Sequence, residues 1–218
     1  MKVLAIYCHP EPRSFTRAML DVAMHAVKDA GHGFDCIDLY ADGFDPVAGR
    51  HDFEAPSDPD YFHYQTEQRL AHEGGTFAPV LRDYQRRVAE ADLLVPIFPL
   101  WWGGPPAMLK GWFDRVMAYG FAYVDGARFE SGLFAGKRAL VAVTTGGTQA
   151  RFSDDGTYGS IDKVLWPLLH CQLRYLGYAV AEPFVAYAAP RVSQEERSDL
   201  LNSWARRLTA LLESDATP

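Results

Sequence analysis

The chain has 218 residues, 48% of them hydrophobic, and a formal net charge of −7. This size and apolar content predict a single domain over residues 1–218 with a sizeable core. Because the sequence contains no basic block and no apolar run of membrane-spanning length, we expect neither nucleic acid as a partner nor a transmembrane helix.

Cysteine usage indicates the compartment. Cys8, Cys36 and Cys171 are odd in number, widely spaced and set among apolar residues, so we expect three buried thiols and a reducing cytoplasm. No CxxC pair occurs and the histidines lack ligand spacing, so no metal site is predicted.

The chain opens with a βαβ pattern. Residues 2–8 are a continuous apolar run, which predicts a buried strand, and residues 34–39 predict the second. Between them, Ser14 is the expected N-cap of a helix that ends at Gly31. The loop over residues 9–16 offers hydroxyls, an imidazole and an arginine at a helix N-terminus, which is a place where anions bind. It is either a phosphate site or simply the start of a capped helix.

Residues 40–90 interrupt the alternation with turn-rich segments and scattered aromatic residues. A short helix is predicted over residues 64–73, and Pro79 suits the first position of another. An insertion of this length serves the function, forms an interface or decorates the surface.

A third buried strand is predicted over residues 91–98, where Pro96 removes a ladder hydrogen bond and should cause a bulge or leave an N–H unpaired. The following loop holds two tryptophans, two glycines and two prolines before a helix over residues 106–118. Such an apolar loop at a strand end favours a flat apolar ligand, unless Trp101 and Trp102 belong to the core.

The second half of the chain completes the alternation. A glycine- and aromatic-rich excursion over residues 120–136 precedes a fourth strand over 138–144, whose Thr-Thr-Gly-Gly end lets backbone N–H groups approach a ligand. A helix follows over 161–176, with Pro167 as an internal kink or a late start, and 178–188 predict the fifth strand. Ser193 to Glu196 form a capping box for the final helix.

Five strands alternating with helices predict an α/β fold, a flavodoxin-like doubly wound parallel five-stranded sheet of order 2-1-3-4-5 with helices on both faces. In that order the loops after strands one, three and four border one crevice. They are the three unusual loops of this sequence, and they offer phosphate donors, flat apolar walls and backbone amides. That combination suits a flavin.

Several motifs follow one another along nearly the whole chain. They are His9-Pro10-Glu11 with Ser14-Phe15, Asp38-Leu39-Tyr40 with Phe44-Asp45-Pro46, the stretch 98–113, Phe121-Ala122-Tyr123, Thr144-Thr145-Gly146-Gly147, Leu165-Trp166-Pro167 and Glu182-Pro183. In this order they resemble the NAD(P)H:quinone oxidoreductase (DT-diaphorase) family.

The resemblance implies an FAD-dependent homodimer that passes hydride from NAD(P)H through flavin N5 to a quinone in a two-electron, ping-pong cycle. By position it implies cofactor contacts from His9, Ser14, Phe15, Thr16, Ala18, His63, Pro99, Leu100, Trp101, Trp102, Gly103, Thr144, Thr145, Gly146, Gly147 and Arg197. His63 favours FAD over FMN, because family members with the long insertion contact the adenosine part there. The substrate pocket is expected to comprise Trp102, Phe152 and Tyr158, with Tyr123 and Asp125 of the partner subunit.

One departure from the family concerns the expected catalytic residues Gly147, Phe152 and Tyr158. Animal members place a Tyr and a His where this chain has Phe152 and Tyr158. Phe152 has no donor, so stabilisation of developing negative charge falls on backbone N–H groups near Gly147 and on Tyr158. We expect slower hydride transfer than in those enzymes, or a shifted substrate preference. Asp125 replaces an aromatic residue of many relatives, which predicts a more polar pocket.

Other functions remain open from the sequence. A nitro- or azo-reductase would use the same chemistry, since a reduced flavin in an open pocket serves many acceptors. A flavin-binding regulatory subunit of a potassium efflux system would turn over poorly with NAD(P)H and menadione. The remaining alternative is a flavodoxin-type sheet that binds no cofactor.

Overall fold

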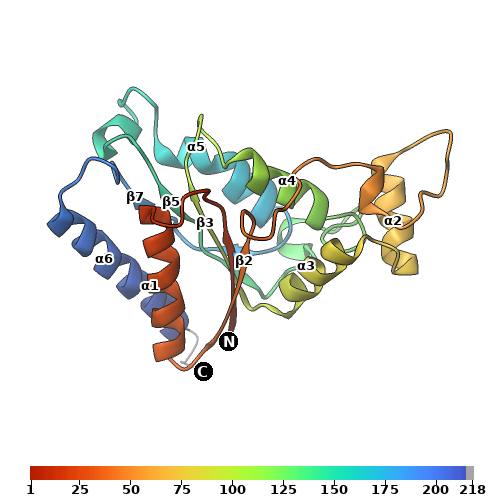
Figure 1. Cartoon of the computed structure of the whole chain (residues 1–218), viewed down its shortest axis with the longest axis horizontal. Helices are drawn as coiled ribbons and strands as arrows, with labels where there is room; N and C mark the ends of the chain where they lie inside the picture. Colours follow the sequence, from red (N-terminus) through yellow and green to blue (C-terminus); the bar gives the residue numbers. More distant parts are fainter. Residues whose placement is uncertain (215–218) are drawn as a thin grey trace.

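A parallel sheet with helices on both faces forms the centre of the molecule (Figure 1), in a computed structural model that describes residues 1–214. Its strands are β1 (Lys2–Tyr7), β2 (Gly33–Asp38), β3 (Leu93–Pro99), β4 (Arg138–Ala139), β5 (Ala142–Thr144), β6 (Ala179–Val180) and β7 (Phe184–Ala186). β4 and β5 lie in turn along one edge of β3, and β6 and β7 pair with them in the same sequence. The seven strands therefore follow five paths in the order 2-1-3-4-5, which confirms the predicted topology.

The break between β4 and β5 faces Pro96. β3 pairs with β1 without interruption, Pro96 opposite Ile6, so the expected bulge is wrong. On the other edge, pairing stops after Leu94 with Ala139 and resumes at Ile97 with Ala142, in unchanged register. Proline has no N–H to donate to that neighbour, and the ladder opens there. The interruption agrees with the premise that proline removes a ladder hydrogen bond, while the predicted unpaired N–H stays a prediction.

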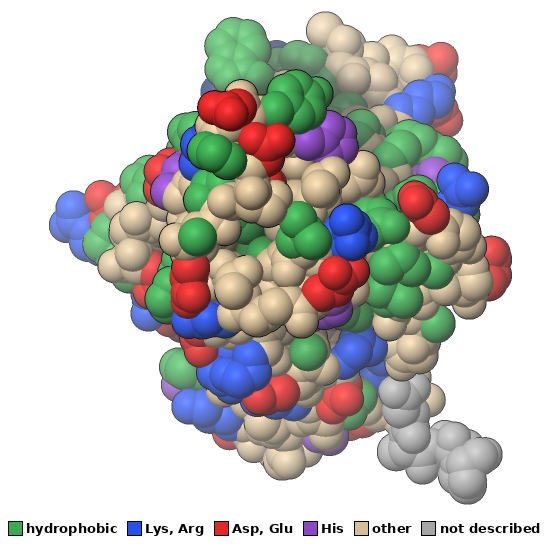
Figure 2. Space-filling model, turned by 90° about the vertical axis from the view of Figure 1, so that its right-hand side faces the viewer, with side chains coloured by type: hydrophobic (Ala, Val, Ile, Leu, Met, Phe, Trp, Pro, Cys, Tyr) green, Lys and Arg blue, Asp and Glu red, His purple; other side chains and the backbone are tan. Residues whose placement is uncertain are grey.

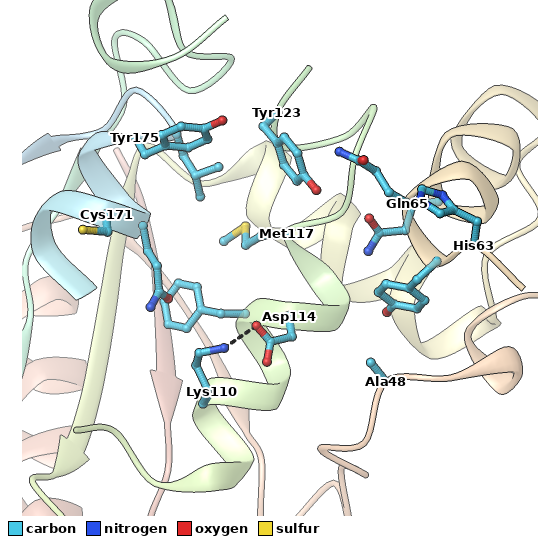
Figure 3. Close-up of a pocket in the computed structure, with 14 residues that line it drawn as sticks. Ala48, His63, Gln65, Lys110, Asp114, Met117, Tyr123, Cys171 and Tyr175 are labelled. Carbon is cyan, nitrogen blue, oxygen red and sulfur yellow. Dashed lines mark hydrogen bonds and ion pairs between the residues drawn. The ribbon is translucent and has the colours of Figure 1, made fainter. Parts of the chain in front are cut away.

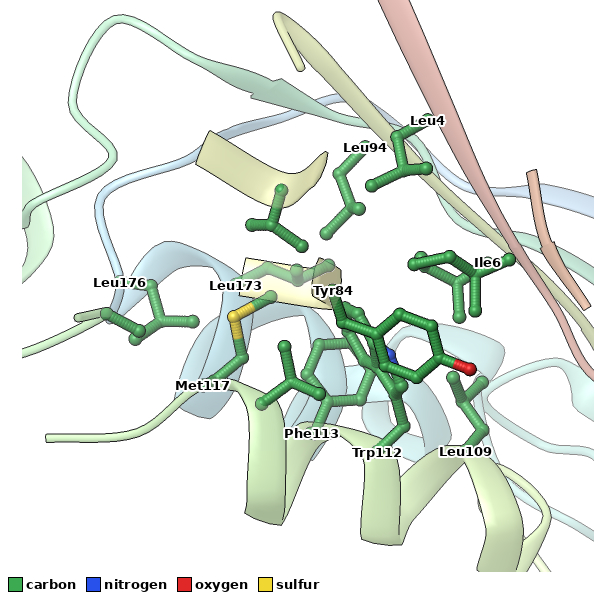
Figure 4. Packing of buried hydrophobic residues seen from close by; sticks show 14 of the residues in the cluster. Leu4, Ile6, Tyr84, Leu94, Leu109, Trp112, Phe113, Met117, Leu173 and Leu176 are labelled. Atoms are coloured by element: carbon green, nitrogen blue, oxygen red, sulfur yellow. The ribbon is translucent and has the colours of Figure 1, made fainter. Parts of the chain in front are cut away.

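The helices divide between the two faces of the sheet (Figure 1). On one face lie α1 (Phe15–Asp29) and α6 (Gln194–Glu213); on the other lie α3 (Pro79–Glu90), α4 (Ala107–Val116) and α5 (Ile161–Leu168). Figure 4 shows the second layer, where Trp112 and Phe113 of α4 lie near Leu4 and Ile6 of β1 in one buried cluster. Pro167 lies inside α5, so it is internal to the helix rather than its start. Six residues of π-helix, Leu169–Arg174, continue α5.

The insertion over residues 40–90 is joined to the domain by buried polar contacts. It contains a 3-10 turn, Arg50–Asp52, and α2 (Tyr64–Gly74), which projects from the sheet (Figure 1). Asp52 is fully buried and accepts hydrogen bonds from Arg115 Nε at 2.7 Å and from Tyr64 Oη at 2.5 Å. A Cβ on Gly111 would lie 2.1 Å from the Pro46 carbonyl oxygen, so only glycine allows this close approach. These contacts hold the insertion against α4.

The helix starts predicted at Ser14 and Ser193 are confirmed, whereas the predicted burial of one cysteine is not. The Ser14 hydroxyl accepts the Arg17 N–H at 3.1 Å, and Ser193 with Glu196 forms a complete capping box. Cys8 is buried and Cys36 partly so, and burial raises the pKa of each thiol to about 12. Cys171 is exposed, because the π-helix turns Leu173 inward instead. The expectation of three buried thiols is therefore wrong at that position.

The surface on the α2 side mixes both signs of charge with separate apolar side chains (Figure 2). In the described part of the chain, residues 1–214, no helix has both the length and the apolar content needed to cross a membrane.

Candidate functional site

The loops after β1, β3 and β5 meet at one edge of the sheet and enclose a cavity of about 440 Å³, which we call the crevice. It is lined by His9, Ser14, Phe15, Thr16, Pro99, Leu100, Trp101, Thr144, Thr145, Gly146, Ala189, Pro190 and Arg197. The structure thus brings together most residues that the sequence assigned to the cofactor. None of the residues that line it is acidic.

Hydrogen bonds join the three loops of the crevice. The Thr16 and Thr144 hydroxyl oxygens lie 3.1 Å apart and connect the first loop to the third. The Leu100 N–H donates to the Thr144 carbonyl at 2.8 Å, which connects the second loop to the third. The crevice is therefore preformed by the chain itself.

His9 is a neutral donor at this edge. Its Nδ1 accepts the Glu11 N–H at 3.0 Å, which leaves the proton of the neutral ring on Nε2. Burial is the main cause that lowers the pKa of His9 below its ordinary value, so the neutral form prevails at pH 7.

Arg197 supplies the positive charge of the crevice. It lies in the first turns of α6, and its Nε is buried without a hydrogen-bond partner among the described residues. A buried guanidinium N–H without an acceptor is unfavourable, and a phosphate oxygen is a matching acceptor. Because hydroxyls, this arginine and apolar side chains line one cavity, the crevice fits the phosphate tail and flat ring of a flavin.

A second cavity of about 390 Å³ opens beside the crevice and shares Leu100, Thr145 and Gly146 with it; we call it the acceptor cavity. Its other lining residues are Trp102, Gly103, Gly147, Arg151, Phe152, Tyr158, Val164 and Arg191. A Cβ on Gly147 would lie 2.9 Å from the Phe152 ring and 3.0 Å from the Tyr158 ring. Glycine at this position therefore lets both rings lie directly on the backbone.

Trp102 stands at the tip of a tight hairpin between the two cavities. Trp101 and Gly104 exchange both backbone hydrogen bonds at 3.0 Å, and the central residues Trp102 and Gly103 have φ of 51° and 75°. Trp102 is fully exposed, and Trp101 is 42% exposed. The reading of the two tryptophans as core is therefore wrong. A non-glycine residue with positive φ is strained, and such strain concentrates at functional sites.

Four residues assigned from the sequence lie outside both cavities. Ala18 uses its N–H for the first helical bond, to Ser14 O, and does not line the crevice. Asp125 lies on an exposed turn and accepts a hydrogen bond from Tyr119 at 3.3 Å. His63 and Tyr123 face a separate cavity of about 630 Å³ between α2, α4 and the π-helix, the lateral cavity (Figure 3). His63 is also the N-cap of α2, since its Nδ1 accepts the Thr66 N–H.

Sequence reasoning missed Val164, Arg151 and Arg191 of the acceptor cavity, and Ala189 and Pro190 of the crevice. Ala189, Pro190 and Arg191 lie in the loop after the final strand, β7, and the predicted site did not include this loop. Ala188 N–H donates to the Gly147 carbonyl at 2.8 Å and draws this loop to the others. The signal was present in the strand order, because the fifth strand is next to the fourth.

Comparisons with known proteins agree with this geometry. A family model described as a flavodoxin-like fold matches residues 1–208. The chain is 39% identical over 218 residues to a ribosyldihydronicotinamide dehydrogenase [quinone] of Pongo abelii, covering 100% of this chain and 94% of the relative. It is 38% identical to NAD(P)H dehydrogenase [quinone] 1 of Cavia porcellus, covering 100% and 78%. The crystal structure of a putative quinone reductase from Klebsiella pneumoniae superposes with a TM-score of 0.93 at 37% identity, covering 97% of this chain and 85% of that one. The chain therefore belongs to the flavodoxin-like family and, within it, to the family of quinone dehydrogenases that these relatives represent.

Proposed function

We propose that the chain is an FAD-dependent oxidoreductase that transfers two electrons from NAD(P)H to a quinone. The observation that carries the proposal is the buried Nε of Arg197, which has no partner among the described residues and lies in a crevice that shares lining residues with the acceptor cavity. The names of the relatives add support, since they print quinone as the acceptor and either NAD(P)H or ribosyldihydronicotinamide as the donor.

In this proposal the crevice binds the cofactor. Ser14, Thr16 and Arg197 hold the phosphates, and Trp101 with Leu100 lines the face of the flat ring. A flavin held there would supply the two-electron chemistry, hydride transfer from a nicotinamide to a quinone. We propose that donor and acceptor would use the acceptor cavity in turn, in a ping-pong cycle.

The residues around Gly147 then act on the charge that develops in the reaction. Phe152 and Tyr158 press on Gly147 from one side, and only Tyr158 carries a hydroxyl. The Thr145 hydroxyl donates to the Gly147 carbonyl at 2.7 Å and orients this loop. The donors left for developing charge are the Tyr158 hydroxyl and the backbone N–H groups near Gly147, and fixed donors stabilise charge because they need no reorganisation during the reaction.

We further propose a homodimer in which Tyr123 and Asp125 of one subunit complete the acceptor cavity of the other. In a single chain these residues lie away from that cavity, while Tyr123 faces the lateral cavity beside α2. The Oε1 atom of Gln172, which also lines the lateral cavity, is buried without a partner among the described residues. His63 borders the same cavity, and a dimer that places it near the adenosine part favours FAD over FMN. Sedimentation equilibrium tests the dimer.

The decisive test is the absorption spectrum of freshly purified protein, followed by addition of NADPH without air. Flavin bands that bleach on reduction support the proposal. So does reduction of menadione when it is then added without air. Colourless protein that stays so after incubation with FAD and FMN contradicts it. Faster turnover of nitro- or azo-compounds than of quinones identifies the reductase alternative. Bound flavin without turnover identifies the regulatory alternative.

We also propose that the protein resides in the cytoplasm, because all three cysteines are free thiols.

A further inference from the structure

The acceptor cavity carries two arginines and no acidic residue. Arg151 and Arg191 both line it, and both are exposed to solvent. The chain as a whole holds 28 acidic and 21 basic side chains, so an uncompensated pair of cations is not expected from composition. Neither guanidinium forms an ion pair with a carboxylate of residues 1–214.

Both arginines are held in place by the residues of the site. The Arg191 guanidinium donates to the Gly146 carbonyl, and its backbone N–H donates to Ala188 O at 2.7 Å. Arg151 Nη1 lies 3.4 Å from the Tyr158 hydroxyl oxygen, and its guanidinium carbon is 6.0 Å from the centre of the Tyr158 ring. The structure records one side-chain hydrogen bond for each guanidinium, which leaves most of its five N–H donors free. Guanidinium donors that remain free are suited to phosphate oxygens.

From these contacts we propose that Arg151 and Arg191 bind the phosphate groups of the nicotinamide donor, so that the chain uses NAD(P)H in preference to dihydronicotinamide riboside. The inference rests on the proposed function. Donor and quinone occupy the acceptor cavity in turn, and a simple quinone is neutral. NADH and NADPH both bring a pyrophosphate, and NADPH brings a third phosphate. The riboside presents the same reacting ring without any of these charges.

The test compares Arg151→Gln, Arg191→Gln and the double variant with wild type, each loaded with FAD, using menadione as acceptor. The double variant should lose about tenfold or more in kcat/KM for NADH and NADPH, because hydrogen bonds to charged groups are lost. It should change by less than about twofold for dihydronicotinamide riboside, which has no phosphate for those bonds. Arg206→Gln is the matched control, since Arg206 is an exposed arginine on α6 outside both cavities. Arg191→Lys keeps the charge and should recover part of the loss.

A binding measurement makes the test independent of turnover. Calorimetric titration of NADP⁺ into the holoenzyme should show weaker binding in the double variant, and higher salt should reduce the difference. Equal loss with the riboside, or unchanged affinity for NADP⁺, overturns the inference. A sulfonated quinone, tested with the riboside as donor, shows whether the arginines bind an anionic acceptor instead of the phosphates of the donor. A loss confined to that acceptor shows that the arginines serve the acceptor, which also overturns the inference. Absence of turnover with every donor contradicts the proposed function, while the calorimetry still decides the role of the arginines.

Discussion

The rings of Phe152 and Tyr158 lie 5.1 Å apart, inclined by 45°, and both press against the backbone of Gly147. Gly147 belongs to the loop after β5, whereas the two rings belong to the polar segment that follows it. This contact brings one hydroxyl and one plain phenyl group to the place where the crevice meets the acceptor cavity. Of these two rings, only Tyr158 can donate a side-chain hydrogen bond beside Gly147.

Adding a hydroxyl to Phe152 should increase turnover. Phe152→Tyr provides a donor beside Gly147, and a donor aimed at developing charge accelerates a reaction by about tenfold or more. The measurement is steady-state kcat with NADPH and menadione. Phe62→Tyr makes the same change outside both cavities and serves as the control. No gain in kcat over wild type would show that charge at this position does not limit the reaction.

Neutralising Arg197 should weaken cofactor binding. Arg197→Gln removes the guanidinium of the crevice, and we expect the Kd of FAD to rise by about tenfold or more, because charge-assisted bonds to phosphate are lost. Quenching of flavin fluorescence during titration of the apoprotein measures this Kd. Arg206→Gln, on the same helix, should bind FAD as wild type does. An unchanged Kd in Arg197→Gln would remove the phosphate role from this residue.

Breaking the buried ion pair of the insertion should destabilise the fold. Asp52→Ala leaves the Arg115 guanidinium buried without its carboxylate, and the expected loss is about 3–5 kcal/mol of unfolding free energy. Urea denaturation measures it. Asp154→Ala removes a carboxylate from an exposed pair with Lys163 and should cost about 1 kcal/mol or less. Similar losses in the two variants would contradict the anchoring role of Asp52.

The pair between Asp35 and Arg87 should make stability depend on pH. Arg87 donates two hydrogen bonds, at 2.8 and 2.7 Å, and these are the main cause that lowers the pKa of Asp35 below its ordinary value. A lowered folded-state pKa means that the contribution is complete above the unfolded pKa of about 3.9 and is lost as pH falls through the folded pKa. The stability difference between wild type and Asp35→Asn should therefore be constant near neutrality and shrink below about pH 4. Urea denaturation across this range checks it, and a difference that does not vary with pH would refute the assignment.

Local signals in the sequence predicted the scaffold well. Ser14 and the Ser193 to Glu196 box were recognised as helix starts because capping depends only on neighbouring residues. Pro96 predicted the loss of a ladder hydrogen bond because a missing donor is a property of the residue itself. Cys171 was misjudged because apolar neighbours in sequence do not determine which way a helical residue points.

In the site, too, some features could be predicted from the sequence and others depended on tertiary packing. Strand order alone was sufficient to predict that residues near positions 9–16, 99–103 and 144–147 meet, since parallel strands end at one edge of the sheet. The family resemblance assigned roles to residues by their position in the sequence alone. It could not show that His63 caps α2, or that Tyr123 faces the lateral cavity instead of the acceptor cavity. These are consequences of how α2 and the excursion pack on α4.

The sequence by itself determined the alternation of strands and helices, the caps and the chemistry of the three loops, because these follow from short-range periodicity and residue type. Only the tertiary structure decided that Arg197 Nε is buried without a partner, and that Arg151 and Arg191, forty positions apart, share one cavity free of carboxylates. Burial and charge balance are properties of groups gathered from distant parts of the chain, and they exist only once the chain has folded.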